Sequence, residues 1–336
     1  MSIPAPTELI GQQAVIRPLL EAAVADRLHH CYLFEGPPGV GKRTAAMGVA
    51  MAAACEAAFG RPCRTCPTCT QFEKGHHPDL LLIEPDPARA TRTISVDQAR
   101  EVVRQVGLRR YNARRRTIII DPVDSLMPQA ANALLKTLEE PPEGTGFVLV
   151  TAQVSSLLPT VRSRSQRVRF RAVPHPELVA WLRGRDIEDA ERVASRSRGS
   201  PGNALALADG GLKQLDAIRS DALGAITGDQ GARESFAEAL AKGGRAKAGP
   251  RLDVLLEVLE GLTRDAVLWS AGRQDGLLNS DLPQVVERWS VALWPGGIAR
   301  LQQEIDQARV RADINVNLRL LVETLLTRVS RELGLS

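Results

Sequence analysis

The 336-residue chain has few aromatic residues and no long apolar run. Aromatic side chains make up 4% of it, and no apolar stretch approaches the ~18 residues that a membrane-spanning helix requires. Residues 1–8 contain neither the basic segment nor the apolar segment with which a secretory signal begins. These absences predict a cytoplasmic protein without a membrane partner.

A strong charge of either sign is also missing. The formal net charge is +4, from 43 basic and 39 acidic residues, and arginine far outnumbers lysine. Codon bias in a GC-rich genome explains the excess of arginine better than contact with nucleic acid does. The densest basic stretch, residues 109–116, has only Tyr111 beside it for base stacking, so we expect a solvated strand edge there. The composition therefore does not indicate DNA binding.

Cysteine is scarce too, and four of the five cysteines lie in one short stretch. The clustered residues are Cys55, Cys63, Cys66 and Cys69. Such clustering in a cytosolic chain favours a metal over disulfides. Cys-x-x-Cys spacing presents paired sulfurs to Zn²⁺, and four thiolates leave no open position for catalysis, so we expect structural zinc. His76 and His77 lie nearby and are expected to be structural, while Cys31 is expected to lie in the core.

The length and the order of elements predict several domains. One hydrophobic core usually stops growing at about 250–300 residues. Short apolar runs alternate with helical patterns in the first half of the chain, which predicts a parallel α/β sheet. After His175 the strand pattern fades and helical patterns continue. We expect an α/β domain at 1–171 with an insert at about 55–69, a small helical domain at 172–212 and a helical domain at 213–336.

The individual elements follow from periodicity and from capping residues. The expected strands are Cys31–Phe34, Leu80–Ile83, Thr117–Ile120, Phe147–Val150 and Val168–Phe170. The clearest helices are Arg43–Ala54, Val96–Val106 and Ala130–Glu140, the last of them preceded by Pro128 and ended by two prolines.

A glycine-rich turn joins the first expected strand to the helix that follows it. This is the context of a phosphate loop, in which backbone N–H groups surround phosphates, a lysine reaches the β- and γ-phosphates and the next hydroxyl holds Mg²⁺. The loop keeps its glycines and its lysine, at Gly36, Gly39, Gly41 and Lys42. Arg43 stands where the hydroxyl belongs, and Thr44 comes one position later. The pattern predicts a degenerate nucleotide site, and it leaves open whether ATP or ADP still binds.

The third expected strand ends in Asp121, where a carboxylate is placed to hold Mg²⁺. A hydrolytic site of this class also needs an acidic residue directly afterwards to polarise the attacking water, and this chain has Pro122. Asp124 is three positions on and in place to cap the next turn. The losses at Arg43 and Pro122 together predict poor hydrolysis.

Ser163-Arg164-Ser165 follows the fourth expected strand. In an α/β nucleotide domain, an arginine beyond this strand can project across a subunit boundary, and such a finger in trans is worth ~10³–10⁵ in rate. On residue types alone, Arg164 competes for this role with Arg162, Arg167 and Arg169.

Several stretches together resemble the bacterial DNA polymerase III clamp-loader subunits of the AAA+ class. They are residues 29–36, the four-cysteine insert, Asn132–Pro142 and Ser163–Ser165, with Asn132–Pro142 the most specific. The resemblance covers most of the first 205 residues, and Asn315–Leu326 is similar to the last collar helix of these subunits. It implies an AAA+ P-loop domain with a parallel sheet, a small helical lid and an all-helical collar.

Within that family the chain resembles the delta prime branch more than the ATP-hydrolysing gamma/tau branch. Gamma/tau-like chains keep a hydroxyl after the loop lysine and an acidic pair after the third strand. The lid stretch Gly199–Asn203 also lacks the arginine of a working second sensor. The Ser-Arg-Ser triplet replaces the Ser-Arg-Cys of the family but retains Arg164, and Thr151 matches the first sensor position.

The resemblance implies a place in a hetero-pentameric ring with gamma/tau and delta subunits. Such a ring loads a sliding clamp onto primed DNA during replication. The chain would join it through residues 213–336 and offer Arg164 to a neighbouring site. Two alternatives remain: an active motor ATPase that uses Thr44 and Asp121, and a stand-alone zinc-containing nucleotide-binding module.

Overall fold

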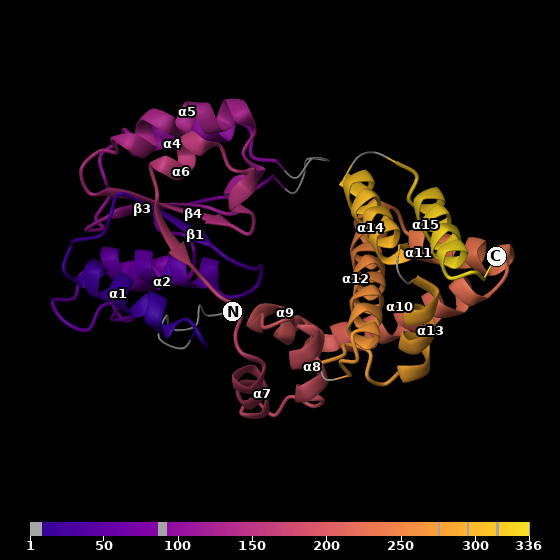
Figure 1. Cartoon of the computed structure of the whole chain (residues 1–336). Coiled ribbons are helices and arrows are strands. Elements are labelled where there is room, and N and C mark those ends of the chain that lie inside the picture. Colours follow the sequence, from indigo (N-terminus) through magenta and orange to yellow (C-terminus); the bar gives the residue numbers. More distant parts are fainter. Residues whose placement is uncertain (1–8, 87–92, 275, 294–295, 314–315, 336) are drawn as a thin grey trace. The chain divides into compact units, whose positions relative to one another are not determined.

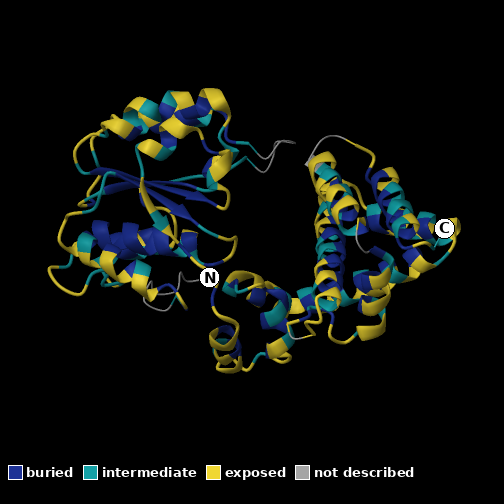
Figure 2. Ribbon diagram, viewed as in Figure 1, coloured by how far each residue is buried: buried dark blue, intermediate teal, exposed yellow. Residues whose placement is uncertain are grey.

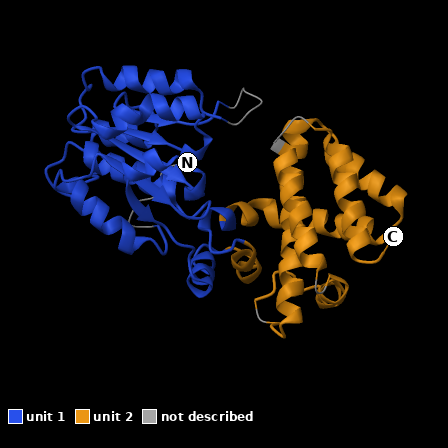
Figure 3. Ribbon diagram, turned by 45° about the horizontal axis from the view of Figure 1, so that its top comes forward, with its two compact units in different colours: residues 1–186, 197–204 blue, residues 187–196, 205–336 orange. Residues whose placement is uncertain are grey.

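The computed structural model describes residues 9–86, 93–274, 276–293, 296–313 and 316–335 (Figure 1). The N-terminal residues 1–8 and Asn315 of the expected collar motif lie outside these ranges. The chain divides into two compact units, one of residues 1–186 and 197–204, the other of residues 187–196 and 205–336 (Figure 3). The expected small helical domain is thus shared between the units, and the three-domain division stays a prediction.

The first unit is built on five parallel strands in the order β2-β3-β4-β1-β5. They are β1 (Cys31–Glu35), β2 (Leu80–Ile83), β3 (Arg116–Ile120), β4 (Thr145–Thr151) and β5 (Gln166–Arg169). Four lie where the sequence predicts them, with β2 matching at both ends. The fifth was placed too late, because β5 pairs with β1 through Gln166 to Arg169 and Phe170 follows it. The predicted parallel α/β sheet is confirmed.

Helices cover both faces of this sheet (Figure 1). One face carries α1 (Gln13–Val24) and α2 (Lys42–Ala54), and the other carries α4 (Val96–Val106), α5 (Pro128–Glu139) and α6 (Pro159–Ser163). Short elements fill the connections: α3 (Pro67–Glu73), η2 (Val123–Ser125), η3 (Val154–Ser156) and α7 (His175–Arg183).

Alternation along β1 shows how the strands serve two cores. Tyr32 and Phe34 pack toward α2, whereas Cys31 and Leu33 pack toward α4 and α5. A strand buried on both faces reads as a continuous apolar run, which is why the sequence revealed it. Figure 2 shows these strands buried between the helical layers. Cys31 lies in the core as expected.

Local signals explain where the best-predicted helices begin. Ser95 accepts a hydrogen bond from the backbone N–H of Gln98, and the Gln98 side chain accepts one from the Ser95 backbone N–H, a complete capping box for α4. Pro128 occupies the first turn of α5, where its missing N–H is not needed. These caps fix the helix starts independently of tertiary packing.

The second unit is helical. It contains α8 (Ala190–Arg196), the last residues of α9 (Pro201–Ala206), η4 (Leu207–Gly211), α10 (Leu212–Thr227), α11 (Gln230–Ala241), α12 (Arg245–Ser270), α13 (Pro283–Leu293), α14 (Gly297–Asp313) and α15 (Leu318–Glu332). One apolar core, mostly of leucine, valine and alanine, joins α10 to α15. Burying each leucine side chain contributes about 1.5–3 kcal/mol, so this core is the main stabilising term.

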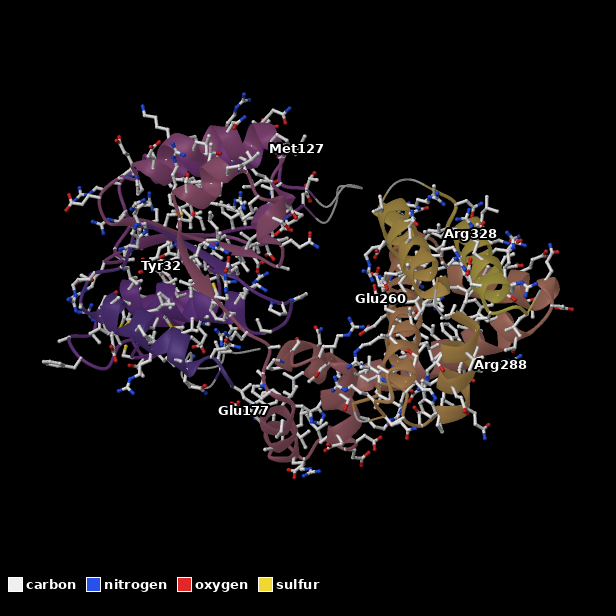
Figure 4. All side chains as sticks on the ribbon, in the orientation of Figure 1. Tyr32, Met127, Glu177, Glu260, Arg288 and Arg328 are labelled. Carbon is white, nitrogen blue, oxygen red and sulfur yellow. The ribbon has the colours of Figure 1, made fainter. Side chains whose placement is uncertain are left out.

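Polar contacts fasten α8 and the helices to one another in this unit. Arg196 of α8 and Arg219 of α10 both donate to Oδ1 of Asn279, at 2.8 and 3.1 Å. Glu260 of α12 and Arg328 of α15 are labelled in Figure 4. Glu260 pairs with Arg309 of α14 at 2.8 Å, and Arg328 pairs with Glu304 of α14. No helix among the described residues is both long and apolar enough to cross a bilayer.

Candidate functional sites

The phosphate loop leaves the carboxyl end of β1 and enters α2 at Lys42. Gly36 has φ +148°, and a Cβ there would overlap the carbonyl oxygen of Phe170. Gly39 has φ +70°, and a Cβ there would overlap the Ser200 hydroxyl. Only glycine fits both positions, so the loop has the geometry its sequence predicts.

Lys42 turns back onto its own loop. The residue is 6% exposed, and Nζ donates to the carbonyl oxygens of Gly36 and Pro37 at 2.6 Å each. Burial lowers the pKa of Lys42, and the carboxylates of Asp121 and Asp124 oppose that shift. An ammonium has three N–H donors, so one remains for a phosphate.

A pocket of about 360 Å³ opens beside the loop. It is lined by Pro38, Gly39, Gly41, Lys42, Arg43, Thr44, Asp121, Pro122, Val150, Thr151, Ala152 and Gly202. The structure therefore brings five of the six expected cofactor residues to one cavity. Gly36 lies behind the loop against Phe170 instead.

Arg43, which lines this pocket, contacts two carboxylates. Its Nη2 donates to Oε2 of Glu84 at 3.0 Å, its Nη1 bonds the other oxygen of that carboxylate, and Nη1 lies 3.8 Å from Oδ2 of Asp121. The hydrogen bond to Glu84 raises the pKa of Arg43. Burial raises the pKa of Asp121, and the Arg43 charge opposes that shift. A permanent cation therefore lies between the acidic groups at the ends of β2 and β3.

Sequence reasoning missed Glu84, although a signal was present. Glu84 directly follows β2, and Asp121 directly follows β3, which pairs with β2 in parallel. The carboxyl ends of adjacent parallel strands meet at one edge of a sheet, where ligand sites form. An acidic residue after a neighbouring strand was therefore a candidate.

The prediction that Asp124 caps a turn is wrong. The η2 turn has no side-chain cap, and Asp124 Oδ1 instead accepts a hydrogen bond from Thr151 Oγ1 at 2.7 Å. The pairing of β3 with β4 brings the two residues to the same edge. Thr151, the expected first sensor, is thus fixed to Asp124 beside the pocket.

The start of α9 packs against the phosphate loop at Gly39. The backbone N–H of Gly202 donates to the carbonyl oxygen of Gly39 at 2.9 Å. Ser200 accepts from the backbone N–H of Asn203 at 3.2 Å, and both side chains lie against Gly39. The lid stretch that lacks a second-sensor arginine therefore contacts the loop through Gly202 and Asn203.

Arg164 lies outside this pocket, directly after α6. Its Nη1 donates to the carbonyl oxygen of Thr160 at 3.0 Å, and Nη2 donates to Glu139 Oε1 at 3.2 Å. Nε lies 3.1 Å from Glu139 Oε2 without the alignment of a hydrogen bond. A shallow pocket of about 310 Å³ adjoins it, lined by His29, His30, Glu139, Ser163, Arg164, Ser165 and Gln166.

The competing arginines of β5 have a different role. Arg167 and Arg169 both pair with Glu35 at the end of β1, at 2.7 and 2.9 Å. Burial alone would raise the pKa of Glu35, but hydrogen bonds from the two guanidinium groups outweigh it and the pKa lies below its ordinary value. These two arginines therefore compensate a buried carboxylate.

The four clustered cysteines converge on one point. The Sγ atoms of Cys55, Cys63, Cys66 and Cys69 all lie within 4.8 Å of one another. The α3 helix starts at Pro67, and the Cys66 sulfur accepts a hydrogen bond from the backbone N–H of Cys69 at 3.4 Å. Four sulfurs at this spacing fit a tetrahedral metal ion. The expected metal-ligand set is thus brought together and can bind a metal.

His77 and the basic stretch belong to a separate structural network. His77 is buried and bonds Asn112, as expected for a structural histidine. The solvated strand edge expected at 109–116 is wrong for Arg116, which is buried at the start of the inner strand β3 and pairs with Asp79 at 3.0 Å. Asp79 also accepts from the backbone N–H groups of residues 111–113. The buried carboxylate attracts the arginine that composition alone assigned to solvent.

The strand order, with a glycine-rich loop after β1 and Asp121 after β3, is that of an AAA+ P-loop protein. Comparison with known proteins then identifies the family. The family model described as DNA polymerase III, delta subunit, matches residues 11–174, and that described as DNA polymerase III, delta subunit, C terminal, matches residues 213–331. The chain belongs to the family of DNA polymerase III clamp-loader subunits.

Individual relatives agree with this assignment. The DNA polymerase III subunit delta' of Bacillus subtilis is 28% identical over 94% of this chain and 95% of its own length. The subunit delta' of Pseudomonas aeruginosa is 36% identical over 55% of this chain and 57% of its own length. The Bacillus subtilis subunit tau is 33% identical over 66% of this chain, which spans 38% of that protein.

A solved structure of a DNA polymerase III gamma subunit-related protein from Thermotoga maritima is 19% identical. The alignment covers 95% of this chain and 99% of that chain with a TM-score of 0.47.

Proposed function

We propose that this clamp-loader subunit is of the delta prime type. It hydrolyses ATP poorly itself and supplies Arg164 in trans to the active site of a neighbouring gamma/tau subunit. Poor hydrolysis is supported above all by the Arg43 guanidinium, which lies between Glu84 and Asp121. The match to delta' of Bacillus subtilis over nearly the full length of both chains supports the subunit type.

The chemistry of the pocket favours a poor ATPase. Mg²⁺ at a phosphate loop needs the hydroxyl after the lysine and a nearby carboxylate. Here the hydroxyl is absent, and the guanidinium already neutralises the carboxylates and repels a second cation. Pro122 offers no base for the attacking water. Each loss acts on a different part of the reaction, so restoring one does not restore hydrolysis.

Arg164 fits the role of a finger better than Arg167 and Arg169 do. Arg167 and Arg169 compensate the buried Glu35, and removing either weakens that compensation. Arg164 is held at two points, by the Thr160 carbonyl and by Glu139, beside a surface pocket. Preorganised positive charge of this kind stabilises the charge that develops on a transferring phosphoryl group.

We also propose that the four cysteines bind structural zinc. Hydrogen bonds, the largest from the Thr65 side chain, lower the pKa of Cys63 to about 6, whereas burial raises the pKa of Cys69. Zn²⁺ requires deprotonated thiols, and four of them complete its coordination without a site for water. Purified chain is expected to contain about one equivalent of zinc.

The wider role follows the family. We propose a cytoplasmic hetero-pentameric ring with gamma/tau and delta subunits, joined through residues 213–336. The ring opens a sliding clamp and loads it onto primed DNA, and this chain contributes geometry while its neighbour carries out the chemistry. The ADP or ATP site of this chain is retained for binding.

The finger assignment is tested in a reconstituted complex with a gamma/tau subunit. Wild-type chain, Arg164→Ala and Arg162→Ala are compared for stimulated ATP turnover. Arg162 is the matched control, because it lies on the short helix α6 that Arg164 directly follows. We expect Arg164→Ala to lose the stimulation and Arg162→Ala to keep it. Equal stimulation by all three chains would rule out the finger.

A further inference from the structure

We propose that the phosphate loop binds a nucleoside diphosphate without a divalent cation, the Arg43 guanidinium standing in for the metal. This deepens the proposed function, because it states which ligand the degenerate site accepts. The inference separates two properties that a competent site combines, phosphate binding and metal binding.

The position of the guanidinium carries the inference. Both terminal nitrogens of Arg43 bond the two oxygens of Glu84, and Nη1 also lies 3.8 Å from Asp121. These carboxylates follow the neighbouring strands β2 and β3. The cation is therefore centred on the acidic groups at the strand ends, where a P-loop protein holds its Mg²⁺.

A metal ion has to compete with this arginine, whose pair with Glu84 is half-exposed. Mg²⁺ demands nearly octahedral oxygen ligands at ~2.0–2.1 Å and gives up its waters reluctantly. Arg43 is the second residue of α2, so its side chain cannot diffuse away when a metal arrives. Both carboxylates would have to release the guanidinium, which would then remain as a positive charge beside the metal.

The phosphate-binding half of the site is intact. The α2 helix has 13 residues and begins at Lys42, so its first N–H groups and its dipole point toward the loop. Lys42 is 6% exposed, and its ammonium keeps one N–H beyond the two that hold the loop. The adjoining pocket has about 360 Å³. None of these groups needs a metal to attract an anion.

The charge balance favours a diphosphate over a triphosphate. A γ-phosphate would approach Asp121 and Glu84, and Mg²⁺ normally offsets that repulsion by bridging the β- and γ-oxygens. Here one guanidinium is already shared by both carboxylates. A diphosphate contacts only the loop and Lys42 and does not approach Asp121 and Glu84.

Titration of the full-length chain with ADP tests the proposal. Binding is measured calorimetrically in Mg²⁺ and again with the metal removed by EDTA. We expect the two dissociation constants to agree within about twofold. A loss of affinity of about tenfold or more in EDTA, or no ADP binding in either buffer, would overturn the inference.

Variants make the test specific to Arg43. Arg43→Thr restores a hydroxyl and frees Glu84 and Asp121, so its ADP affinity is expected to fall in EDTA and to recover in Mg²⁺. Arg17→Thr is the control, since Arg17 forms an exposed pair with Glu21 on α1. It should behave as wild type. Equal metal dependence of Arg43→Thr and wild type would contradict the role of the guanidinium.

Failure here is distinguishable from failure of the proposed function. Metal-dependent ADP binding by wild type would refute metal-independent binding at the phosphate loop, but it would not affect the assignment of Arg164 as the finger. Conversely, Arg164→Ala could leave the turnover of the neighbour unchanged while ADP still binds in EDTA. That result would refute the role of Arg164 in the neighbouring site and would leave metal-independent ADP binding supported.

Discussion

The pocket at the phosphate loop and the surface at Arg164 are built from the same two groups, an arginine and a carboxylate. In the pocket, Arg43 pairs with Glu84 and Asp121, which directly follow the neighbouring strands β2 and β3. At the surface, Arg164 joins Glu139 at the end of α5. The first pair fills the place of a metal, whereas the second holds a cation beside an open pocket.

This difference shows that the role of an arginine–carboxylate pair depends on where the pair lies in the fold. Two further pairs extend the series. Arg116 and Asp79 are both buried and stabilise the sheet. On the second unit, Arg300 is exposed and its partner Glu332 is partly buried. Removing the arginine from each pair should therefore change a different observable.

The largest effect is expected at Arg164. Arg164→Lys keeps the charge but loses the planar fork that grips two phosphate oxygens at once. Turnover by the neighbouring subunit should fall ~10³-fold, nearly as far as with alanine. Steady-state ATP hydrolysis of the assembled complex measures this. Full activity of the lysine variant would mean that only charge is required at this position.

The next effect is expected at the buried pair. Arg116→Met leaves the Asp79 carboxylate without its cation, which costs about 3–5 kcal/mol. For a unit of this size we expect the thermal midpoint to fall by about 10 °C. Arg114→Met is the control, because Arg114 is exposed and lies 3.7 Å from the exposed Asp26. A similar loss in both variants would show that burial is not the cause.

A smaller effect is expected at Glu139. Glu139→Gln keeps the shape but releases Arg164 from its ion pair, and the freed side chain must be ordered again in each turnover. Stimulated kcat should fall by about tenfold or less while KM is unchanged. Glu139→Asp should recover part of the loss. A rise in activity with glutamine would show that Glu139 restrains the finger instead of positioning it.

The smallest effect is expected at Arg300 and Glu332. The hydrogen bond from Arg300 lowers the pKa of Glu332. A carboxylate with a depressed folded pKa stabilises the protein above its unfolded pKa, about 4.3, and this contribution is lost as the pH falls through the folded value. Arg300→Ala should lower the thermal midpoint by less than about 2 °C at neutral pH and not at all once the pH lies below the folded pKa of Glu332. A pH-independent loss would point to packing.

The sequence predicted the elements that depend on local patterns. The apolar runs located four strands, and the cysteine spacing located the metal-ligand set, since both are readable along the chain. It could not predict the partners of Arg43, Arg116 and Arg164. Each partner comes from a segment brought close only by the sheet: Glu84 from β2, Asp79 from the start of β2 and Glu139 from α5.

The same limit explains the failed expectations. Asp124 was assigned to a local cap because the sequence shows only which residues are adjacent in the chain. In the fold, the parallel pairing of β3 and β4 brings Thr151 within hydrogen-bonding distance of Asp124. Arg116 was assigned to solvent because its neighbours are basic, whereas Asp79 lies 37 residues away in the chain. Ion pairs of long sequence separation need the fold to be known.

Our central claim is that this chain does not hydrolyse ATP efficiently itself but retains Arg164 as a finger for the neighbouring site. Its most direct test is steady-state ATP turnover by the isolated full-length chain in Mg²⁺, with Lys42→Ala as the control for contaminating ATPase. We predict that wild type and Lys42→Ala give the same background rate. Turnover by wild type of about 1 s⁻¹ or more, abolished in Lys42→Ala, would contradict the account and identify an active motor subunit.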